Sequence, residues 1–440
     1  MEGRFGYMIS SELNSSSQGH LILGGVDAVE LAHKYGTPLV VYDVEEIRKT
    51  IQQFKNSFEA SGLKYEISYA SKAFATIAMY QVLKQENLHT DVVSGGELFT
   101  ALKAGFPAEK ISFHGNNKSK EELEMAVDNH IGVVIIDNFL EIKLLKEVLE
   151  EKQESINVML RLTPGISAHT HKYDQTGQVD SKFGFDVESG QADQALQQVL
   201  AIPQMNLIGI HAHIGSQIFG VEGFELLAKK MVEISKNWHD KFSFTPQILN
   251  LGGGFGISYT DEDEPIGANV FIDKIISTIK EQTNDKGLQL PEIWIEPGRS
   301  IVGPAGFNLY TVGSRKDIPG LRSYVNVDGG MGDNIRPALY QAKYEAVVAN
   351  KMKATIEEED HIAGKYCESG DILIDKQALP KVEPGDVIAM LDTGAYGYSM
   401  ASNYNRNPRP AVVFVENGKD KLVVKRESYE DLVRLDENYL

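Results

Sequence analysis

Short apolar runs rich in β-branched residues alternate with segments of helical periodicity from about residue 65 onward. Eight such runs occur: "YEISYAS", "HTDVVS", "ISFHGN", "GVVIID", "INVMLRLT", "NLIGIHAHI", "QILNLGG" and "EIWIEPG". Helices fit between most of them, and "SKEELEMAVDN" opens with Ser119 and carries Glu122 three residues later, a capping-box pattern. Eight successive strand–helix units favour a parallel (β/α)8 barrel over an open doubly wound sheet.

The pattern changes after about residue 310. The stretch "RPAVVFVENGKDKLVVKR" contains two alternating apolar runs joined through Asn417-Gly418, a dipeptide typical of tight hairpins. We therefore expect a barrel over residues 45–310 and a mainly antiparallel, sandwich-like or barrel-like β domain over residues 311–440. Residues 1–44, which include "HLILGGV" and "PLVVYDV", fall outside the barrel and are expected to pack with the β domain.

The amino-acid composition limits which binding partners and which cellular compartment we expect for this protein. The 440 residues carry 43 Lys plus Arg against 62 Asp plus Glu, a net charge of −19, which disfavours nucleic acid and anionic membranes as partners. No apolar run is long enough to span a bilayer, and the N-terminus lacks a signal-peptide pattern, so we expect a cytoplasmic protein. The single cysteine, Cys367, rules out an intrachain disulfide; a lone cysteine is most often a small buried apolar side chain.

Polar residues gather where the expected barrel strands end. In such barrels the chemistry lies at the carboxyl ends of the strands, and so many polar groups at one rim must pair with one another or bind a ligand. In chain order these residues are Lys72, Asp91, Ser94, Glu97, His114, Asp137, Arg161, His211, His213, Ser216, the glycine run from Gly252, Glu296 and Arg299.

Together these residues match the requirements of a pyridoxal phosphate site. Lys72 reads as a buried lysine able to form a Schiff base, and the glycine run 252–254 could cradle a phosphate through backbone N–H groups. His213 could lie against the cofactor ring, and Glu296 could keep the pyridine nitrogen protonated. Each of these signals is weak alone. A lysine at a strand end, for example, commonly reaches to solvent.

A metallohydrolase is the rival interpretation. His211 and His213 form a His-x-His pair, an arrangement that also holds zinc in barrel hydrolases. Such hydrolases usually carry the pair on the first strand, which here ends in lysine. A second pair, His169 and His171, lies in a polar loop, where local hydrogen bonds are favoured over a stray metal site. No metal is expected.

A set of motifs covers nearly the whole chain and resembles one known family. They are "YASKAF", "DVVSGGEL", "FHGNNK", "HAHIGSQ", "NLGGGFG", "EPGRS", "VDGGM", "RPALY", "CESGD" and "GAYG". In this order they resemble the diaminopimelate decarboxylases, in the fold-type III pyridoxal-phosphate group with ornithine and arginine decarboxylases and alanine racemase. The resemblance implies a cofactor-binding barrel joined to a β domain of the alanine racemase type.

The resemblance also implies a role for individual residues. Lys72 is similar to the Schiff-base lysine, and Cys367 to the proton donor that the second subunit supplies. The other positions that match cofactor-binding residues are Asp91, Glu97, His213, Ser216, Gly254, Glu296, Gly298, Arg299 and Tyr396. The positions expected to meet the substrate are Arg299, Arg336, Tyr340, Glu368 and Tyr396.

The implied reaction is decarboxylation of meso-diaminopimelate to L-lysine and carbon dioxide, the last step of lysine biosynthesis, in a homodimer with active sites at the subunit interface. Residues 166–181 correspond to a family loop between the fifth strand and "KFGFD". One alternative is a decarboxylase of another basic amino acid, of the ornithine or arginine type. A second is a cofactor-carrying but inactive regulator, against which the intact Lys72 and Cys367 argue.

Overall fold

The computed structural model describes residues 13–166 and 181–440. Most of the loop 166–181, with His169 and His171, lies outside these ranges. The described chain forms two compact units. The first comprises Ile51–Gly256 and Pro265–Ser300; the second comprises residues 13–50 with Ile257–Glu264 and Ile301–Leu440. Residues Ile257–Glu264 therefore belong by their contacts to the second unit, although they lie within the range expected for the barrel.

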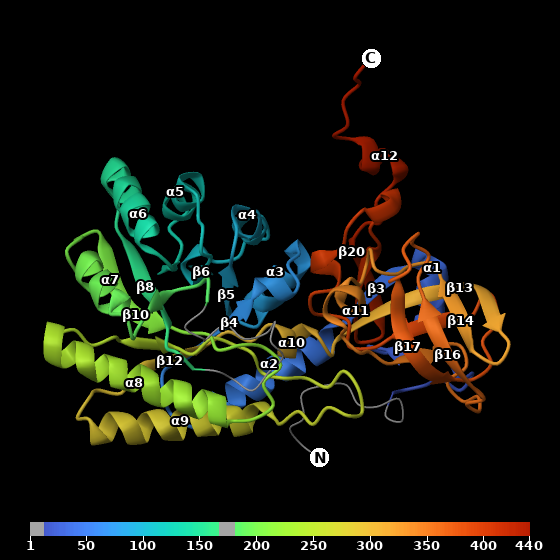
Figure 1. Ribbon diagram of the computed structural model, residues 1–440, viewed down its shortest axis with the longest axis horizontal. Coiled ribbons are helices and arrows are strands. Elements are labelled where there is room, and N and C mark those ends of the chain that lie inside the picture. The colour runs from blue at the N-terminus through green and yellow to red at the C-terminus, as the bar shows by residue number, and fades with distance from the viewer. Residues whose placement is uncertain (1–12, 167–180) are drawn as a thin grey trace. The chain divides into compact units, whose positions relative to one another are not determined.

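The first unit is a closed parallel barrel, as the alternating pattern predicted. Figure 1 shows the strands and helices of this unit. Each strand is parallel to its neighbour, and pairing of the last strand with the first closes the cylinder. The strands are β4 (Tyr65–Ala70), β5 (His89–Val92), β6 (Ile111–Phe113), β7 (Val133–Ile136), β8 (Ile156–Thr163), β10 (Met205–His211), β11 (Ile248–Asn250) and β12 (Glu292–Ile295), with the short β9 (Phe185–Asp186) beside β8. The expectation of eight strand–helix units is confirmed.

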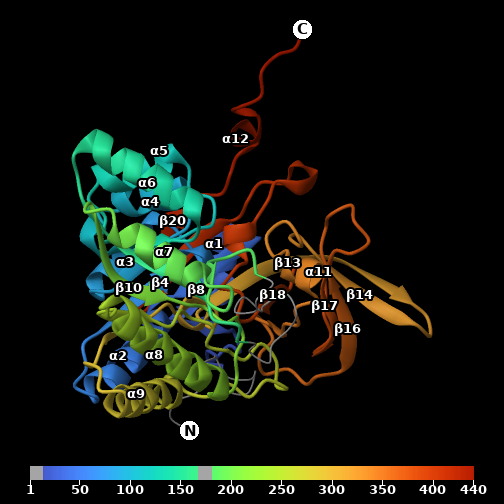
Figure 2. The same ribbon diagram turned by 60° about the vertical axis from the view of Figure 1, so that its left-hand side comes forward.

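α8 (Glu222–Phe242) packs along α9 (Ala268–Asp285) (Figure 2). Helices flank the barrel strands. They are α2 (Val44–Glu59), α3 (Ile77–Gln85), α4 (Gly95–Lys103), α5 (Lys120–Asp128), α6 (Phe139–Lys152), α7 (Gln191–Leu200), α8 (Glu222–Phe242), α9 (Ala268–Asp285) and α10 (Arg299–Val302). The predicted capping box is present at α5, where Ser119 and Glu122 cap each other's backbone N–H groups. No helix within the described ranges is both long and apolar enough to cross a bilayer.

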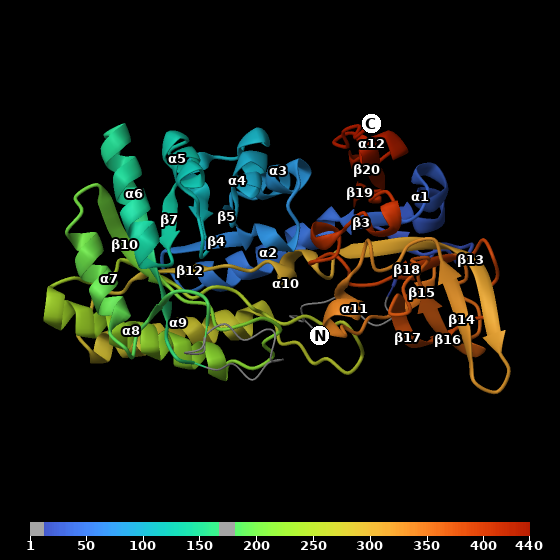
Figure 3. The same ribbon diagram turned by 45° about the horizontal axis from the view of Figure 1, so that its top comes forward.

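The second unit contains a mainly antiparallel sheet in which β3 (Leu39–Asp43) lies between two strands from the C-terminal part of the chain (Figure 3). β3 is antiparallel to β13 (Gly306–Ile318) and parallel to β19 (Ala411–Glu416). The predicted hairpin links β19 to β20 (Lys419–Val424), and both Asn417 and Gly418 have positive φ.

Most remaining strands of the second unit extend this sheet, whereas β1 (Ile22–Leu23) and β2 (Val26–Asp27) form a separate two-stranded antiparallel sheet. β14 (Arg322–Val327) and β16 (Glu358–Ala363) form a second parallel pair, while β16 and β17 (Ile372–Leu379) are antiparallel. The other elements are α1 (Ala28–Tyr35), α11 (Arg336–Tyr340), β15 (Ala346–Val348), β18 (Val387–Met390) and α12 (Tyr429–Val433). Apolar side chains of β3, β13 and β19, among them Val41, Leu309 and Val413, form the core.

His89 makes the stability of the barrel depend on pH. It begins β5, packs edge-on against Trp294 with ring centroids 5.2 Å apart, and places Nε2 3.3 Å from Glu66. Burial, with a smaller contribution from Lys110, lowers the pKa of His89 to about 4. Unfolded histidine has a pKa of about 6.5, so the unfolded chain binds more protons between these values and stability falls as the pH drops through this window.

We expect His89 to cost about 2 kcal/mol of stability between pH 7 and pH 5. The measurement is urea unfolding of the native protein and of His89→Gln at both pH values. The variant should lose less stability on acidification. Glu66, whose pKa burial raises, is present in both proteins, so the difference between the two pH slopes isolates His89. Equal slopes would contradict the prediction.

Candidate functional site

A buried carboxylate, Glu296, follows β12 at the carboxyl end of the barrel. Asn250 at the end of β11 donates its Nδ2–H to Oε1 at 2.7 Å, and His211 at the end of β10 places Nε2 3.0 Å from Oε2. His114, just after β6, places Nε2 2.9 Å from Oε1. The two imidazoles meet edge to face, with centroids 4.9 Å apart. Three strands thus hold one carboxylate.

The electrostatics of this group favour one negative charge with neutral partners. Burial alone would raise the pKa of Glu296, but the contacts with His114 and His211 outweigh it and hold that pKa well below its usual range. Burial lowers the pKa of His211 to about 4, and it also lowers the pKa of His114. Near neutral pH the site therefore contains an ionised Glu296 and two uncharged imidazoles.

Lys72 follows β4 in a short 3-10 turn (Ser71–Ala73) and is exposed, which corrects the expectation of a buried lysine. The strand is buried as far as Ala70, but the chain leaves the barrel wall at the turn and the side chain reaches solvent. The adjacent Ser71 N–H donates to buried Asp91 at 3.0 Å. Burial raises the pKa of Asp91 well above its usual range, as do Glu296 and Glu97, while the Lys72 charge acts in the opposite direction.

Glu97 lies in the first turn of α4, where Ser94 is the N-cap. The Glu97 carboxylate accepts the Val93 N–H at 2.8 Å. Burial raises the pKa of Glu97, and both this hydrogen bond and the Lys72 charge lower it. The charge of Lys72 thus acts on both carboxyl groups, Asp91 and Glu97.

His213 and the glycine run meet at the same rim. His213 Nδ1 accepts the Gly253 N–H at 3.3 Å, and Asn250 accepts that of Gly252 at 3.0 Å. Two of the N–H groups expected to cradle a phosphate are therefore used within the protein. Gly254 has φ +110°, and a Cβ there would lie 2.2 Å from the Gly215 carbonyl oxygen, so only glycine fits. Burial, then the charges of Lys72 and Arg161, lower the pKa of His213 well below its usual range.

Arg299 begins α10 and is buried. Its Nε and Nη2 donate to the Ser216 hydroxyl at 3.1 and 2.9 Å. Gly298 precedes it, and a Cβ at this position would lie 2.7 Å from the Ala70 side chain, so the "EPGR" turn packs directly on the end of β4. Because Ser216 accepts from the guanidinium, its own O–H remains able to donate, and the pair offers only donors to an anion.

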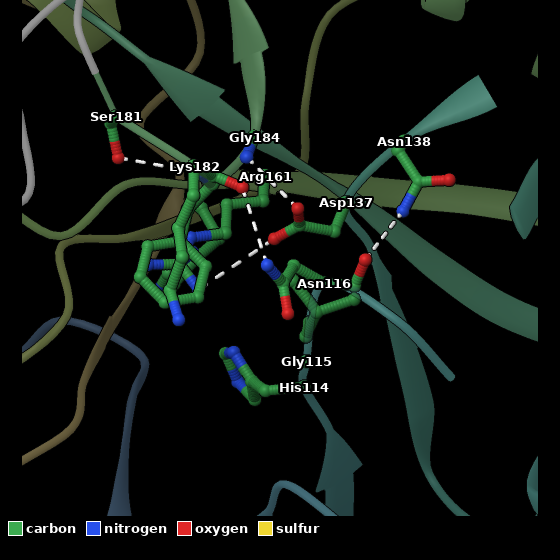
Figure 4. A network of polar contacts seen from close by, with 12 residues as sticks. His114, Gly115, Asn116, Asp137, Asn138, Arg161, Ser181, Lys182 and Gly184 are labelled. Carbon is green, nitrogen blue, oxygen red and sulfur yellow. Dashed lines mark hydrogen bonds and ion pairs between the residues drawn. The ribbon is translucent and has the colours of Figure 1, made fainter. Parts of the chain in front are cut away.

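A network on the neighbouring strands holds the segment that begins at residue 181 (Figure 4). Asp137 at the end of β7 accepts the Gly184 N–H at 3.0 Å and lies 3.7 Å from the Arg161 guanidinium. Asn116 donates to the Lys182 carbonyl at 3.4 Å. Asp137 and Arg161, which the sequence placed at strand ends, thus anchor a rim segment.

In the second unit, α11 carries a buried arginine with an unusual set of partners. Arg336 Nη1 donates to the hydroxyls of Tyr259 and Tyr344, each at 2.7 Å. No carboxylate within the described ranges forms an ion pair with Arg336, and its Nε and Nη2 have no acceptor there. Tyr340, one helical turn further on, is 43% exposed. Sequence reasoning singled out Arg336 and Tyr340 but missed both supporting tyrosines.

In the "CESGD" segment Cys367, Glu368 and Ser369 are exposed, whereas Asp371 is buried. The interpretation of the cysteine as a buried apolar side chain is therefore wrong. The Cys367 N–H donates to Asn405 at 2.8 Å, and Asp371 accepts the N–H of the preceding Tyr366 at 2.9 Å. Tyr396 is partly buried with φ +59°, a left-handed conformation that is uncommon for a tyrosine.

Comparison with known proteins shows which family the chain matches. Residues 44–303 match the family described as "Pyridoxal-dependent decarboxylase, pyridoxal binding domain". The chain is 59% identical over 421 residues to a diaminopimelate decarboxylase of Bacillus subtilis, covering 96% of each chain. It is 46% identical over 419 residues to that of Staphylococcus aureus, covering 95% of this chain and 98% of the relative.

Solved structures agree with the sequence relatives. A diaminopimelate decarboxylase from M. jannaschii in complex with L-lysine superposes with a TM-score of 0.92 at 36% identity, covering 98% of this chain and 99% of that one. A lysine/ornithine decarboxylase from Vibrio vulnificus, at 21% identity and a TM-score of 0.72, shares the fold. With a full-length match to several decarboxylases and a cofactor-domain match over most of the barrel, this chain belongs to the pyridoxal-dependent decarboxylases.

Proposed function

We propose that this chain removes one carboxylate of meso-2,6-diaminopimelate to give L-lysine and carbon dioxide, using pyridoxal phosphate. The observation that carries the choice of substrate is Arg336, a buried guanidinium held by two phenols rather than by a carboxylate. Relatives that are 46–59% identical are named diaminopimelate decarboxylase. The alternative is a decarboxylase acting on another basic amino acid, such as ornithine or arginine.

The residues of the barrel rim fit the cofactor. When bound, pyridoxal phosphate supplies an electron sink for the bond that breaks at the α-carbon. Ionised Glu296 suits a protonated ring nitrogen, and His213 offers a flat ring to lie against the cofactor. Arg299 and Ser216 offer donors to its phosphate. We assign the other cofactor-supporting roles to Asp91, Glu97, Gly254, Gly298 and Tyr396.

Lys72 provides the amine that carries the cofactor and, in each turnover, is exchanged for the substrate amine. Its exposure supports this role, because the amine must be reached by both molecules. Asp91 and Glu97 place carboxyl groups near that amine. Cys367 is assigned as the proton donor that replaces the departing carboxylate, and its exposed thiol is accessible for proton transfer.

The far end of diaminopimelate carries a carboxylate beside an amine, so a selective site needs a cation and an anion there. Tyr259 and Tyr344 use both hydrogens of Arg336 Nη1, which leaves the Nε and Nη2 edge for a carboxylate in a two-point contact. Tyr340 would add a phenolic donor from the same helix, and Glu368 would meet the ammonium. Ornithine and lysine would leave the buried guanidinium unpaired.

We expect Lys72→Ala to abolish turnover, because cofactor attachment and product release both lose their amine. Borohydride should bleach the visible band of the native holoenzyme and add the mass of reduced cofactor to the peptide containing Lys72. The variant should show neither change. Lys84→Ala, on α3, is the control and should behave as native. A variant that kept both the band and the activity would disprove the role of Lys72.

The proposed homodimer is tested by mixing two inactive proteins. Lys72 lies in the barrel, whereas Cys367 and Tyr396 lie in the second unit. If two subunits complete each site, Lys72→Ala and Cys367→Ala chains that exchange subunits should regain part of the native activity, since a hybrid dimer contains one intact site. Absence of recovery despite exchange, followed by mass spectrometry of differently tagged chains, would place all catalytic groups of a site in one chain.

Arg336→Leu should lower kcat/KM for diaminopimelate by roughly 10²-fold or more, because losing one partner of a buried charge pair costs roughly 2–5 kcal/mol. Arg336→Lys keeps the charge but loses the planar fork and should also be impaired. The assay measures carbon dioxide release from diaminopimelate, ornithine, arginine and lysine with one preparation. Equal or greater kcat/KM on ornithine or arginine would refute the substrate while leaving the cofactor chemistry intact.

A further inference from the structure

The two carboxylate oxygens of Glu296 differ in the number of polar side chains that contact them. Oε1 receives Asn250 Nδ2 at 2.7 Å and lies 2.9 Å from His114 Nε2, whereas Oε2 has only His211 Nε2, at 3.0 Å, among the residues that the structure describes. An ionised carboxylate offers about four acceptor positions. Oε1 is thus covered by one hydrogen bond and the close His114 contact, while Oε2 accepts one hydrogen bond and has about one position left for a further donor.

The two imidazoles approach Glu296 through the same ring atom. Each points Nε2 at the carboxylate, and an uncharged imidazole can donate there only if its proton is on Nε2. Consistent with this tautomer, the buried Nδ1 of His211 has no hydrogen-bond partner in the described part of the chain. His211 contacts Glu296 with hydrogen-bond geometry, while His114 makes a close contact without that alignment.

The same three residues satisfy the distance requirement for a metal site. Ligand atoms of His114, His211 and Glu296 all lie within 4.8 Å of one another, a different set from the His211 and His213 pair that the sequence raised. The Asn250 amide, however, directs an N–H at Oε1, and a hydrogen-bond donor there stabilises the bare anion without a cation. A donor arrangement accounts for Asn250 and His211, whereas a metal site gives Asn250 no role.

We propose that His114 and His211 are positioning residues that keep Glu296 ionised and oriented toward the ring nitrogen of bound pyridoxal phosphate. His211 acts as a neutral N–H donor, and His114 acts through its close contact with Oε1 and its edge-to-face packing on His211. This inference rests on the role of Glu296 in the proposed function. Neutral donors stabilise the carboxylate without cancelling its charge, so Glu296 can hold the ring nitrogen protonated. A charged arginine or lysine in place of these imidazoles would compete with the ring N–H for the same anion.

The test reads the ring nitrogen directly in full-length holoenzyme loaded with cofactor labelled with 15N in the ring. The native protein should give the chemical shift of a protonated ring nitrogen. His211→Leu, which removes the N–H donor, and His114→Leu, which removes the close contact with Oε1, should move the shift toward that of unprotonated pyridine. His211→Gln, which keeps an N–H, should stay nearer the native value. His89→Leu is the matched control, because this histidine also faces a glutamate but begins its strand, and its shift should be native.

A second measurement compares pyridoxal phosphate with an analogue in which C–H replaces the ring nitrogen. The native apoenzyme should bind the natural cofactor more tightly, and either Leu variant should lose this preference by roughly tenfold or more, the effect of one hydrogen bond to a charged group. Should the Leu variants not fold, His211→Gln and Glu296→Gln decide between the same outcomes, with native-like preference expected in the first and its loss in the second.

The possible failures are distinguishable. If the native enzyme shows no preference between the two cofactors, or an unprotonated ring nitrogen, the assigned role of Glu296 fails. If Glu296→Gln removes the preference but folded His114→Leu and His211→Leu keep both the preference and the native shift, the inference about the two histidines fails while the proposed function stands. One zinc ion per chain, lost in His211→Leu, would overturn the inference in favour of a metal site.

Discussion

Closure of the parallel barrel is the constraint on which the cofactor site depends. Pairing of β12 with β4, and of β8 with β10, brings the carboxyl ends of eight strands around one rim. Residues 85 apart in the chain, His211 and Glu296, thereby come within 3.0 Å. The side chains on Glu296 come from three separate strands and loops, so no local segment could form this site alone. The fold creates the site by making strand ends neighbours.

Much of this arrangement is predictable from sequence because it follows from local periodicity. The eight strands, the capping box at Ser119 and the hairpin at Asn417 each depend on a few consecutive residues. The strand-end residues were predicted to meet because parallel strands end at one edge. Glu296 and His213 were found in this way, by their positions and not by any contact visible in the sequence.

What sequence could not predict depends on contacts between distant segments. Tyr259 follows the glycine run and Tyr344 follows α11, and nothing in either local pattern indicates that both hold Arg336. The Gly253 N–H is likewise occupied because the pairing of β10 with β11 brings His213 beside it. The exposure of Lys72 was missed because Ala70 and Ala73 on either side of it are buried, whereas the short 3-10 turn directs the lysine side chain to solvent.

Buried charges in this protein fall into two kinds, and the difference separates structural groups from ligand-binding ones. Lys118 and Glu141 are 1% and 2% exposed and 2.7 Å apart, so each compensates the other and neither has charge left for a ligand. Glu296 and Arg336 are also buried, yet their hydrogen-bond partners are amide, imidazole and phenol groups and not side chains of opposite charge. Uncharged partners repay part of the desolvation cost while preserving the net charge. A buried ion that is hydrogen-bonded but not neutralised remains an attractive partner for an ion of opposite sign, which a protonated pyridine ring and a substrate carboxylate respectively supply.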